Sequence, residues 1–182
     1  MPKRISLSPA VLARKLLCTG YVAAPLSKID WIRLRGYHAA AMVKAISRHL
    51  GMGYQLISVE KRGPGYRIDL LFRDTSGTTR AVEVKSGRRI KEVHRFQASL
   101  YSLYSPGVDE VAISNSDQDE LLEPEFVQRV AGVVNSTMQF LESNPQAAAT
   151  RYTPHPDVCP SCANTACPFL KSRGPSISVA LS

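Results

Sequence analysis

Two short apolar runs on either side of a glycine-containing turn constrain the fold of this chain most strongly. The sequence YRIDLLFRDTSGTTRAVEVK places the runs before and after Asp74–Thr78. Runs of this kind around a loop of about five residues are typical of an antiparallel β-hairpin. Each run is interrupted by charge, at Asp69 in the first and at Glu83 and Lys85 in the second. Because burying a charge is costly unless it is paired or bound to a metal, these three residues require an explanation.

The register of the hairpin follows from the centre of its turn. With Ser76 at the centre, Leu70 faces Val82, and Asp69 lies across from Glu83. Directly opposed residues have Cβ atoms about 4.5–5.5 Å apart. Side chains alternate between faces along a strand, so two faces are predicted. One face holds Arg67, Asp69, Ala81, Glu83 and Lys85, and the core face holds Ile68, Leu70, Phe72, Val82 and Val84.

Two carboxylates at that separation suit a divalent metal. Both cannot ionise without repulsion, so the pKa of one should rise unless a cation lies between them. Hard oxygen ligands suit Mg²⁺ or Mn²⁺, and the backbone carbonyl of Val84 could add a ligand. Lys85 could orient a water nucleophile or neutralise charge on a phosphate. The alternative is an ordinary ion pair of Asp69 or Glu83 with Lys85 or Arg67 on a solvated sheet face.

The hydrophobic period changes to that of a helix after Ser86-Gly87. An apolar stripe is formed by Val93, Phe96, Leu100 and Leu103. Gln97 and Tyr101 lie on a neighbouring stripe and, four residues apart, point the same way. An amide and a phenol beside an acidic metal site suit a phosphate backbone. The alternative is that both side chains merely flank the core.

These motifs together resemble the RecB-like branch of the PD-(D/E)XK nuclease superfamily. That branch has an upstream acid, a D/E-x-K strand and a Q-x-x-x-Y helix, which match Asp69, Glu83-Val84-Lys85 and Gln97-x-x-x-Tyr101. A helical histidine helps to hold the metal there; His38 is the matching position, in a helix predicted from about Leu34 to Leu50, and His49 is its competitor. The resemblance implies metal ligands at His38, Asp69, Glu83 and Val84, and catalytic roles for Lys85, Glu83, Asp69, Gln97 and Tyr101.

Four cysteines bracket this region of the sequence. Cys18 precedes it, and Cys159, Cys162 and Cys167 follow it. Four soft ligands are what a tetrahedral zinc or an iron–sulfur cluster needs. A secreted disulfide framework is not expected, because no signal peptide is recognisable and four cysteines are sparse for 182 residues. The one-plus-three arrangement would close both ends of the chain onto one inorganic centre.

The same split of cysteines around a RecB-like core resembles the iron–sulfur nucleases, and most of all the CRISPR-associated RecB-like exonuclease family. The resemblance runs from Cys18 to Cys167. It implies an iron–sulfur cluster, [4Fe-4S] or [2Fe-2S], held by the four cysteines, with zinc as the alternative. It also implies a metal-dependent deoxyribonuclease, an exonuclease with endonuclease activity left open. The implied substrate is single-stranded DNA or single-stranded ends, trimmed for CRISPR adaptation alongside CRISPR integration proteins.

The composition favours a polyanionic partner. The formal net charge is +8, and 44% of the residues are hydrophobic, enough for one domain with a core. Basic residues gather at Arg33-x-Arg35, Lys85–Lys91 and Lys171-x-Arg173. We expect a cytoplasmic protein with no membrane contact, and oligomerisation is left open. The rival function is a non-catalytic nucleic-acid-binding module with a zinc or iron–sulfur site; the lack of a P-loop argues against an ATP-driven enzyme.

The predicted fold is mixed α/β, with a restriction-endonuclease-like nuclease core whose mixed β-sheet is flanked by helices. Besides the hairpin, the sequence predicts a helix at Ser8–Leu17 with Ser8 as N-cap and Pro9 first, strands at Tyr54–Arg62 and Val108–Ser114, and a helix at Glu125–Glu142. The whole chain, 1–182, is predicted to be a single RecB-like domain. Its catalytic core spans about 31–142, an iron–sulfur lobe comes from about 1–30 and 145–173, and 174–182 is a loose tail.

Overall fold

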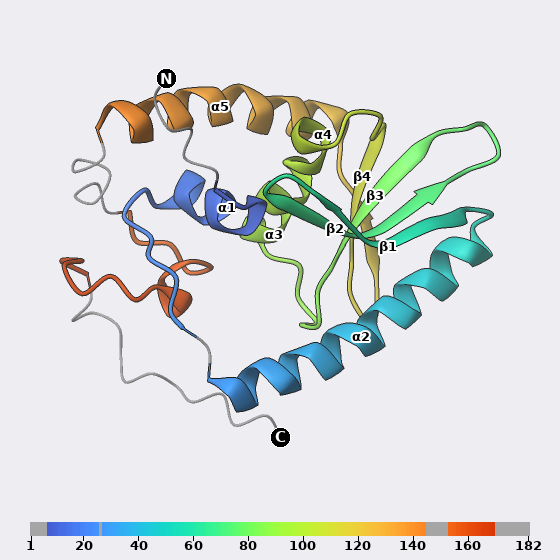
Figure 1. Cartoon of the computed structure of the whole chain (residues 1–182), viewed down its shortest axis with the longest axis horizontal. Coiled ribbons are helices and arrows are strands. Elements are labelled where there is room, and N and C mark those ends of the chain that lie inside the picture. Colours follow the sequence, from blue (N-terminus) through green and yellow to red (C-terminus); the bar gives the residue numbers. More distant parts are fainter. Residues whose placement is uncertain (1–6, 26, 145–152, 170–182) are drawn as a thin grey trace.

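The computed structural model describes residues 7–25, 27–144 and 153–169, and the structural statements below concern these residues. The predicted tail at 174–182 and the basic cluster Lys171-x-Arg173 lie outside them, as does part of the predicted cluster lobe. The described chain is mixed α/β with a five-stranded sheet flanked by helices (Figure 1). The predicted mixed α/β class is confirmed at this level.

An open mixed sheet forms the centre of the fold. Its strands, in spatial order, are β1 (Gln55–Gly63), β2 (Tyr66–Arg73), β3 (Thr79–Val84), β4 (Glu110–Ser114) and β5 (Asp119–Leu121). The pairs β1–β2, β2–β3 and β4–β5 are antiparallel, whereas β3 and β4 are parallel. The parallel step needs a crossover, which α3 (Glu92–Ser99) and α4 (Tyr101–Tyr104) supply. The predicted strands form, and β5 is an addition that its polar sequence does not indicate.

The hairpin of β2 and β3 has the predicted register. Leu70 pairs with Val82 and Phe72 with Arg80. Gly77 in the turn has a φ of 92°, a conformation that favours glycine. The paired residues end at Leu70 and Val82, so the two acidic residues lie just beyond the regular ladder.

Ile68 departs from the predicted core face. It packs with Leu71, Ala81 and Tyr101 rather than with Leu70. The strict alternation of side chains is lost where the β2–β3 ladder stops. Ile68 therefore turns to the opposite layer.

Helices cover both faces of the sheet (Figure 1). α2 (Lys28–Gly51) runs along one face, where its Ala41, Met42 and Ala45 pack against Leu70, Phe72, Val82, Val84 and Ala112. α3 lies on the other face, and α1 (Pro9–Leu17) and α5 (Pro124–Ser143) pack against it. Ser8 and Pro9 begin α1 as predicted. In α5 the predicted inward residues Val130 and Val134 are buried, and the predicted inward side chain of Leu141 lies outside the described residues.

α2 begins well before the predicted start at Leu34. Ser27 caps it, because its Oγ accepts a hydrogen bond from the Asp30 backbone N–H at 3.1 Å. His38 therefore lies inside the helix rather than at its beginning. The apolar period does not reveal this first part, because all residues from 28 to 37 are exposed and bury no stripe.

The helix predicted around Gln97 is divided in two. α3 ends at Ser99, and α4 starts at Tyr101. Val93 and Leu100 are buried as predicted, but Leu103 is 46% exposed. The interruption at Leu100 turns the last predicted residue of the stripe toward solvent.

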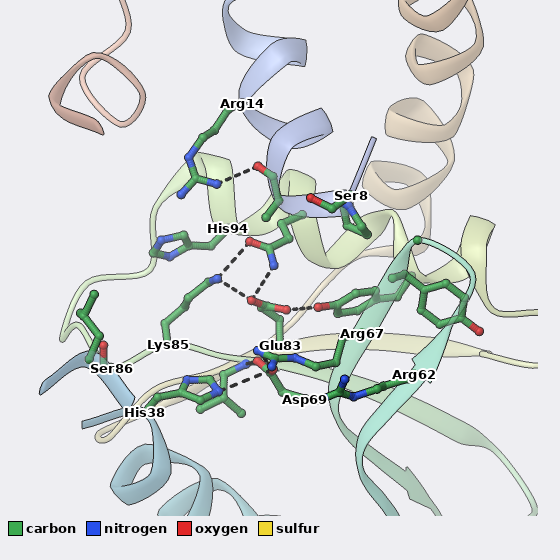
Figure 2. A pocket seen from close by; sticks show the side chains of 18 of the residues that line it. Ser8, Arg14, His38, Arg62, Arg67, Asp69, Glu83, Lys85, Ser86 and His94 are labelled. Carbon is green, nitrogen blue, oxygen red and sulfur yellow. Dashed lines mark hydrogen bonds and ion pairs between the residues drawn. The ribbon is translucent and has the colours of Figure 1, made fainter. Parts of the chain in front are cut away.

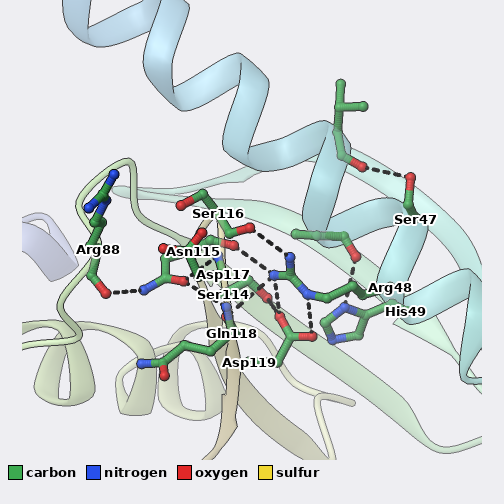
Figure 3. Close-up of polar contacts among 12 residues, drawn as sticks. Ser47, Arg48, His49, Arg88, Ser114, Asn115, Ser116, Asp117, Gln118 and Asp119 are labelled. Carbon is green, nitrogen blue, oxygen red and sulfur yellow. Dashed lines mark hydrogen bonds and ion pairs between the residues drawn. The ribbon is translucent and has the colours of Figure 1, made fainter.

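A polar network ties the end of α2 to the turn between β4 and β5 (Figure 3). Arg48 donates to both carboxylate oxygens of Asp119, at 2.8 and 2.7 Å, and to the carbonyl of Asn115 at 2.7 Å. Ser114 Oγ donates to the same carboxylate at 2.6 Å. Bidentate pairs of this kind combine strength with a fixed geometry, so the network holds α2 in place over the sheet.

Arg48→Met is expected to lower the free energy of unfolding by about 2 kcal/mol, because it leaves Asp119 and the Asn115 carbonyl without charged donors. The measurement is urea denaturation of the purified protein. Ser47→Ala, an exposed change on the same helix, is the control and should cost less than about 0.5 kcal/mol. Equal midpoints for the two variants would show that the network does not stabilise the fold.

Candidate active site

A cavity of about 890 Å³ opens between α1, α2, α3 and the hairpin (Figure 2). Each predicted residue of the hairpin site, the upstream helix and the Gln97 helix lines it. These residues are His38, Asp69, Glu83, Val84, Lys85, Gln97 and Tyr101. The structure therefore brings together residues that are far apart in the sequence.

Glu83 lies at the centre of this group and is 3% exposed. Its Oε1 accepts hydrogen bonds from Lys85 Nζ and, at 2.8 Å, from Gln97 Nε2. Its Oε2 accepts from the hydroxyl of Tyr101. Burial raises the pKa of Glu83; the Lys85 ammonium opposes this shift and Asp69 adds to it. The carboxylate is thus held in one orientation at a position where carrying charge is unfavourable.

Tyr101, at the start of α4, fixes the second carboxylate oxygen of Glu83. Its side chain is almost completely buried, and its hydroxyl points at the carboxylate. Burial raises the pKa of Tyr101 well above its usual range, and the charge of Glu83 raises it further. The phenol therefore stays protonated and donates. The predicted pairing of Gln97 and Tyr101 is observed at Glu83, although the two residues belong to different helices.

Asp69 fills the gap where β2 and β3 part. Its Oδ2 accepts a hydrogen bond from the backbone N–H of Val84 at 2.9 Å, in place of a backbone partner. Its Oδ1 faces His38 Nε2 at 3.5 Å and Arg67 Nη2 at 3.8 Å. Asp69 is 3% exposed, so the solvated sheet face of the alternative interpretation is not what surrounds it.

His38 is the histidine that the structure places beside the acidic residues. Its Nε2 is buried and, although near Asp69, has no hydrogen-bond partner among the described residues. A buried polar nitrogen without a partner is unfavourable and needs an explanation. His49 lies elsewhere: it is fully buried, stacks on Phe72 with ring centroids 4.7 Å apart, and does not line the cavity.

Lys85 projects into the cavity from the end of β3. Its backbone N–H donates to the carbonyl of Ser114 at 2.8 Å, which extends the β3–β4 pairing past the strand end. Its ammonium reaches both Glu83 Oε1 and, at 3.0 Å, Gln97 Oε1. The amide of Gln97 thus bridges the acid and the base, donating to one and accepting from the other.

Further cations surround the cavity. The cavity is also lined by Trp31 and by four arginines, which are Arg14 from α1, Arg35 from α2, Arg62 from β1 and Arg67 from β2. Among these, the sequence indicates Arg67, through its place on the face of Asp69, and Arg35, as part of the basic cluster Arg33-x-Arg35. Arg14 and Arg62 carry no local signal, because their approach to the site depends on how distant elements pack. The total charge gives only the expectation that some basic surface faces a polyanion.

His94 is a further titratable group at the cavity wall. Burial lowers its pKa to about 3, and the nearby cations of Lys85, Lys91 and Arg14 act in the same direction. Its Nδ1 accepts the Lys91 backbone N–H at 3.2 Å, which requires that nitrogen to be unprotonated. His94 is therefore neutral in the folded protein.

Stability is expected to fall as the pH drops below about 6.5, because the unfolded chain then binds a proton that folded His94 rejects down to about pH 3. Comparing urea unfolding at pH 7 and pH 5 should show that wild-type protein loses about 1 kcal/mol more than His94→Asn. This free energy is smaller than the one that corresponds to the full pKa shift of His94, because the ring is partly exposed and solvent screens its interactions. Parallel pH curves would contradict this role for His94.

Two of the four cysteines, Cys18 and Cys162, lie in one small apolar cluster. Cys18 packs with Tyr21 and Val158, and Cys162 contacts the same small core. An antiparallel bridge joins Ala23 to Cys162, and the Val22 backbone N–H approaches Cys162 Sγ at 3.5 Å. These contacts join residues before the sheet to residues after α5.

The other two cysteines, Cys159 and Cys167, lie on either side of Cys162 in the same segment. Cys159 starts a 3₁₀ turn (Cys159–Ser161), and its Sγ accepts the His155 backbone N–H at 3.3 Å. Cys167 lies farther along, where its backbone N–H donates to the Asn164 carbonyl at 3.4 Å. Burial lowers the pKa of Lys15, while the nearby Cys18 and Cys162 act to raise it. Lys15 thus adds a cation beside two of the thiols.

Within residues 7–25, 27–144 and 153–169, no three His, Cys, Asp or Glu side chains are arranged as a metal-binding group. In comparisons with known proteins, no protein-family model matches the chain, and no curated protein matches it. Among the described helices, none is long and apolar enough to cross a membrane.

Proposed function

We propose that this protein is a metal-dependent deoxyribonuclease with a RecB-like, restriction-endonuclease-like core. The observation that carries the proposal is the position of the buried His38 Nε2, which lies 3.5 Å from Asp69 Oδ1 in the cavity that also holds Glu83 and Lys85. An imidazole nitrogen and two carboxylates from three elements, beside a lysine, are the types of group that a metal-dependent phosphodiesterase uses, which supports the proposal.

The donor set fits Mg²⁺ or Mn²⁺ in chemical type. His38, Asp69 and Glu83 would hold the ion, with the Val84 carbonyl as an additional oxygen ligand. The unsatisfied nitrogen of His38 and the raised pKa of Glu83 are both features that a cation would relieve. When bound, the ion supplies a water of lowered pKa and polarises the scissile phosphate.

The chain's own residues orient and stabilise the reacting groups. Lys85 presents an ammonium to the developing negative charge and to the attacking water. Gln97 fixes that ammonium and one oxygen of Glu83, and Tyr101 fixes the other oxygen. The surrounding arginines attract the phosphate backbone, and a substrate with single-stranded ends is proposed because such a strand can enter a cavity rather than lie across it.

We also propose that the four cysteines bind an iron–sulfur cluster, [4Fe-4S] or [2Fe-2S], with a structural role. Support comes from the shared apolar core of Cys18 and Cys162 and from the N–H groups directed at two of the sulfurs. The order of the motifs, with cysteines outside and nuclease residues inside, supports membership of the CRISPR-associated RecB-like exonucleases. A role in trimming DNA for CRISPR adaptation, together with integration proteins, is part of the same proposal.

The test is cleavage of end-labelled single-stranded DNA by protein purified without oxygen, with Mn²⁺ or Mg²⁺ and with chelator. Metal-dependent cleavage that chelator abolishes is the expected result. Tight, metal-independent DNA binding without cleavage would instead assign the chain to the rival class, a non-catalytic nucleic-acid-binding module. A duplex of the same sequence, blunt at both ends, tests the proposed requirement for single-stranded ends.

A further inference from the structure

Trp31 is an exposed aromatic side chain at the rim of the candidate active site. It is 49% exposed and lines both the main cavity and an adjoining cavity of about 380 Å³. The guanidinium of Arg35 lies 4.6 Å from the centre of its ring. That separation is within the range of a cation–π contact, so Arg35 restrains the indole in its position.

The first part of α2 does not contribute to the hydrophobic core. Residues 28 to 37 are all exposed, and the first buried residues of the helix are Ala41 and Met42. A single exposed aromatic side chain needs no explanation by itself, but Trp31 lies at the rim of two adjoining cavities that arginines line. Trp31 is therefore explained better by a ligand than by packing within the described chain.

The spacing of α2 joins Trp31 to the active site. Trp31, Arg35 and His38 are related as i, i+4 and i+7, so they form one stripe along the helix, and each lines both cavities. At 1.5 Å per residue, Trp31 lies about 10 Å from His38 along the helix axis. This distance corresponds to about three stacked nucleotides at 3.4 Å each, so one strand can reach both residues.

The adjoining cavity has the charge of a backbone-binding groove. Arg35, Arg62 and Arg67 line it beside Trp31, and Glu60 is the acid among its lining residues. Glu60 is itself engaged by Arg67, at 3.3 Å. A basic groove with an aromatic platform is the arrangement by which proteins bind single strands without sequence preference.

We propose that Trp31, restrained by Arg35, stacks on an unpaired base of the strand whose scissile phosphate lies beside Lys85. The inference rests on the proposed function and adds to it the group that selects single-stranded over paired substrate. A base inside a duplex is stacked on both sides and offers no free face to an indole, whereas an unpaired base does. Trp31 and Arg35 are thus positioning residues, apart from the residues that contact the reacting phosphate.

Trp31 is the only tryptophan of the chain, so its fluorescence reports directly on stacking. The experiment titrates the full chain, in chelator to prevent cleavage, with a thymidine oligonucleotide and with a blunt duplex. Saturable quenching by the single strand, and little by the duplex, is expected. Equal quenching by both, or none by the single strand, would overturn the inference. Quenching that follows protein concentration without DNA would assign this face to a second copy of the chain and would also overturn it.

Kinetics provide the second measurement. Trp31→Ala should raise KM for single-stranded DNA about tenfold with kcat changed less than about threefold, and Trp31→Phe should restore most of the difference. Arg35→Gln should show a smaller effect in the same direction. Tyr37→Ala and Lys44→Gln are matched controls, because both residues are exposed on the same helix and line neither cavity. Their KM values should equal that of wild type.

The two proposals fail separately. Quenching without any cleavage would support stacking by Trp31 and contradict the proposed nuclease activity. Cleavage with an unchanged KM in Trp31→Ala would support the nuclease and overturn the role of Trp31.

Discussion

Glu83→Gln is expected to reduce metal-dependent cleavage of single-stranded DNA by about a thousandfold while DNA binding stays within a fewfold of wild type. The amide keeps the size of the carboxylate; its single carbonyl oxygen can still accept from Lys85, and its NH2 group can donate to the hydroxyl oxygen of Tyr101. It cannot serve as an anionic ligand, so the cavity loses charge that a cation needs. The measurements are single-turnover cleavage and fluorescence anisotropy of a labelled oligonucleotide.

The control for this prediction separates lost chemistry from lost folding. Glu120→Gln changes the same residue type outside the cavity, where Glu120 pairs with Arg95, and should cleave like wild type. Glu83→Gln itself should be at least as stable as wild type at neutral pH. The folded pKa of Glu83 is raised, so its contribution to stability is present at low pH and is lost as pH rises through that pKa. Full cleavage by a well-folded Glu83→Gln protein would exclude Glu83 as a ligand.

Cys162→Ser is expected to release the bound iron, or zinc, and to lower the melting temperature by about 10 °C. Cys162 joins the cysteine segment to the residues around Cys18, so a metal centre there would hold both ends of the fold together. Elemental analysis, the absorption spectrum and thermal unfolding, all without oxygen, are the measurements. Ser161→Ala is the matched control, since it changes the neighbouring residue in the same turn without removing a thiol.

Two outcomes would decide against the cysteine centre. Purified wild-type protein with neither iron, sulfide nor zinc would remove it altogether. Equal metal content and equal melting temperatures for Cys162→Ser and Ser161→Ala would show that Cys162 is not a ligand. Zinc without sulfide would replace the proposed cluster by a structural zinc site.

The hairpin was predictable because its information is local. The turn fixes the register, and the register brings Asp69 and Glu83 to the same end of the two strands. The position of Ile68 was not predictable, because alternation holds only while a strand keeps its regular partners. The start of α2 was missed for a related reason, since a helix segment that buries nothing has no hydrophobic period.

The choice between His38 and His49 needed tertiary structure. Both lie on α2, and the sequence alone supports His38 only through a resemblance. The packing of α2 on the sheet places one beside Asp69 and the other over Phe72. Trp31 reaches the site on α2, and Arg14 reaches it through the packing of α1 against α3, so no local pattern reveals either residue.

The two oxygens of the Asp69 carboxylate have different partners, one in the hairpin and one in the candidate site. One oxygen of its carboxylate replaces a missing backbone partner for Val84, while the other faces His38. Loss of this side chain would therefore loosen the open end of the hairpin and disturb the position of Glu83 and Lys85 at the same time. Inactive variants that keep the architecture are thus better made at Glu83. The Asp69 carboxylate serves both the hairpin and the candidate site. In related sequences, replacement of Asp69 should therefore accompany a change at Val84 or a different pairing between β2 and β3.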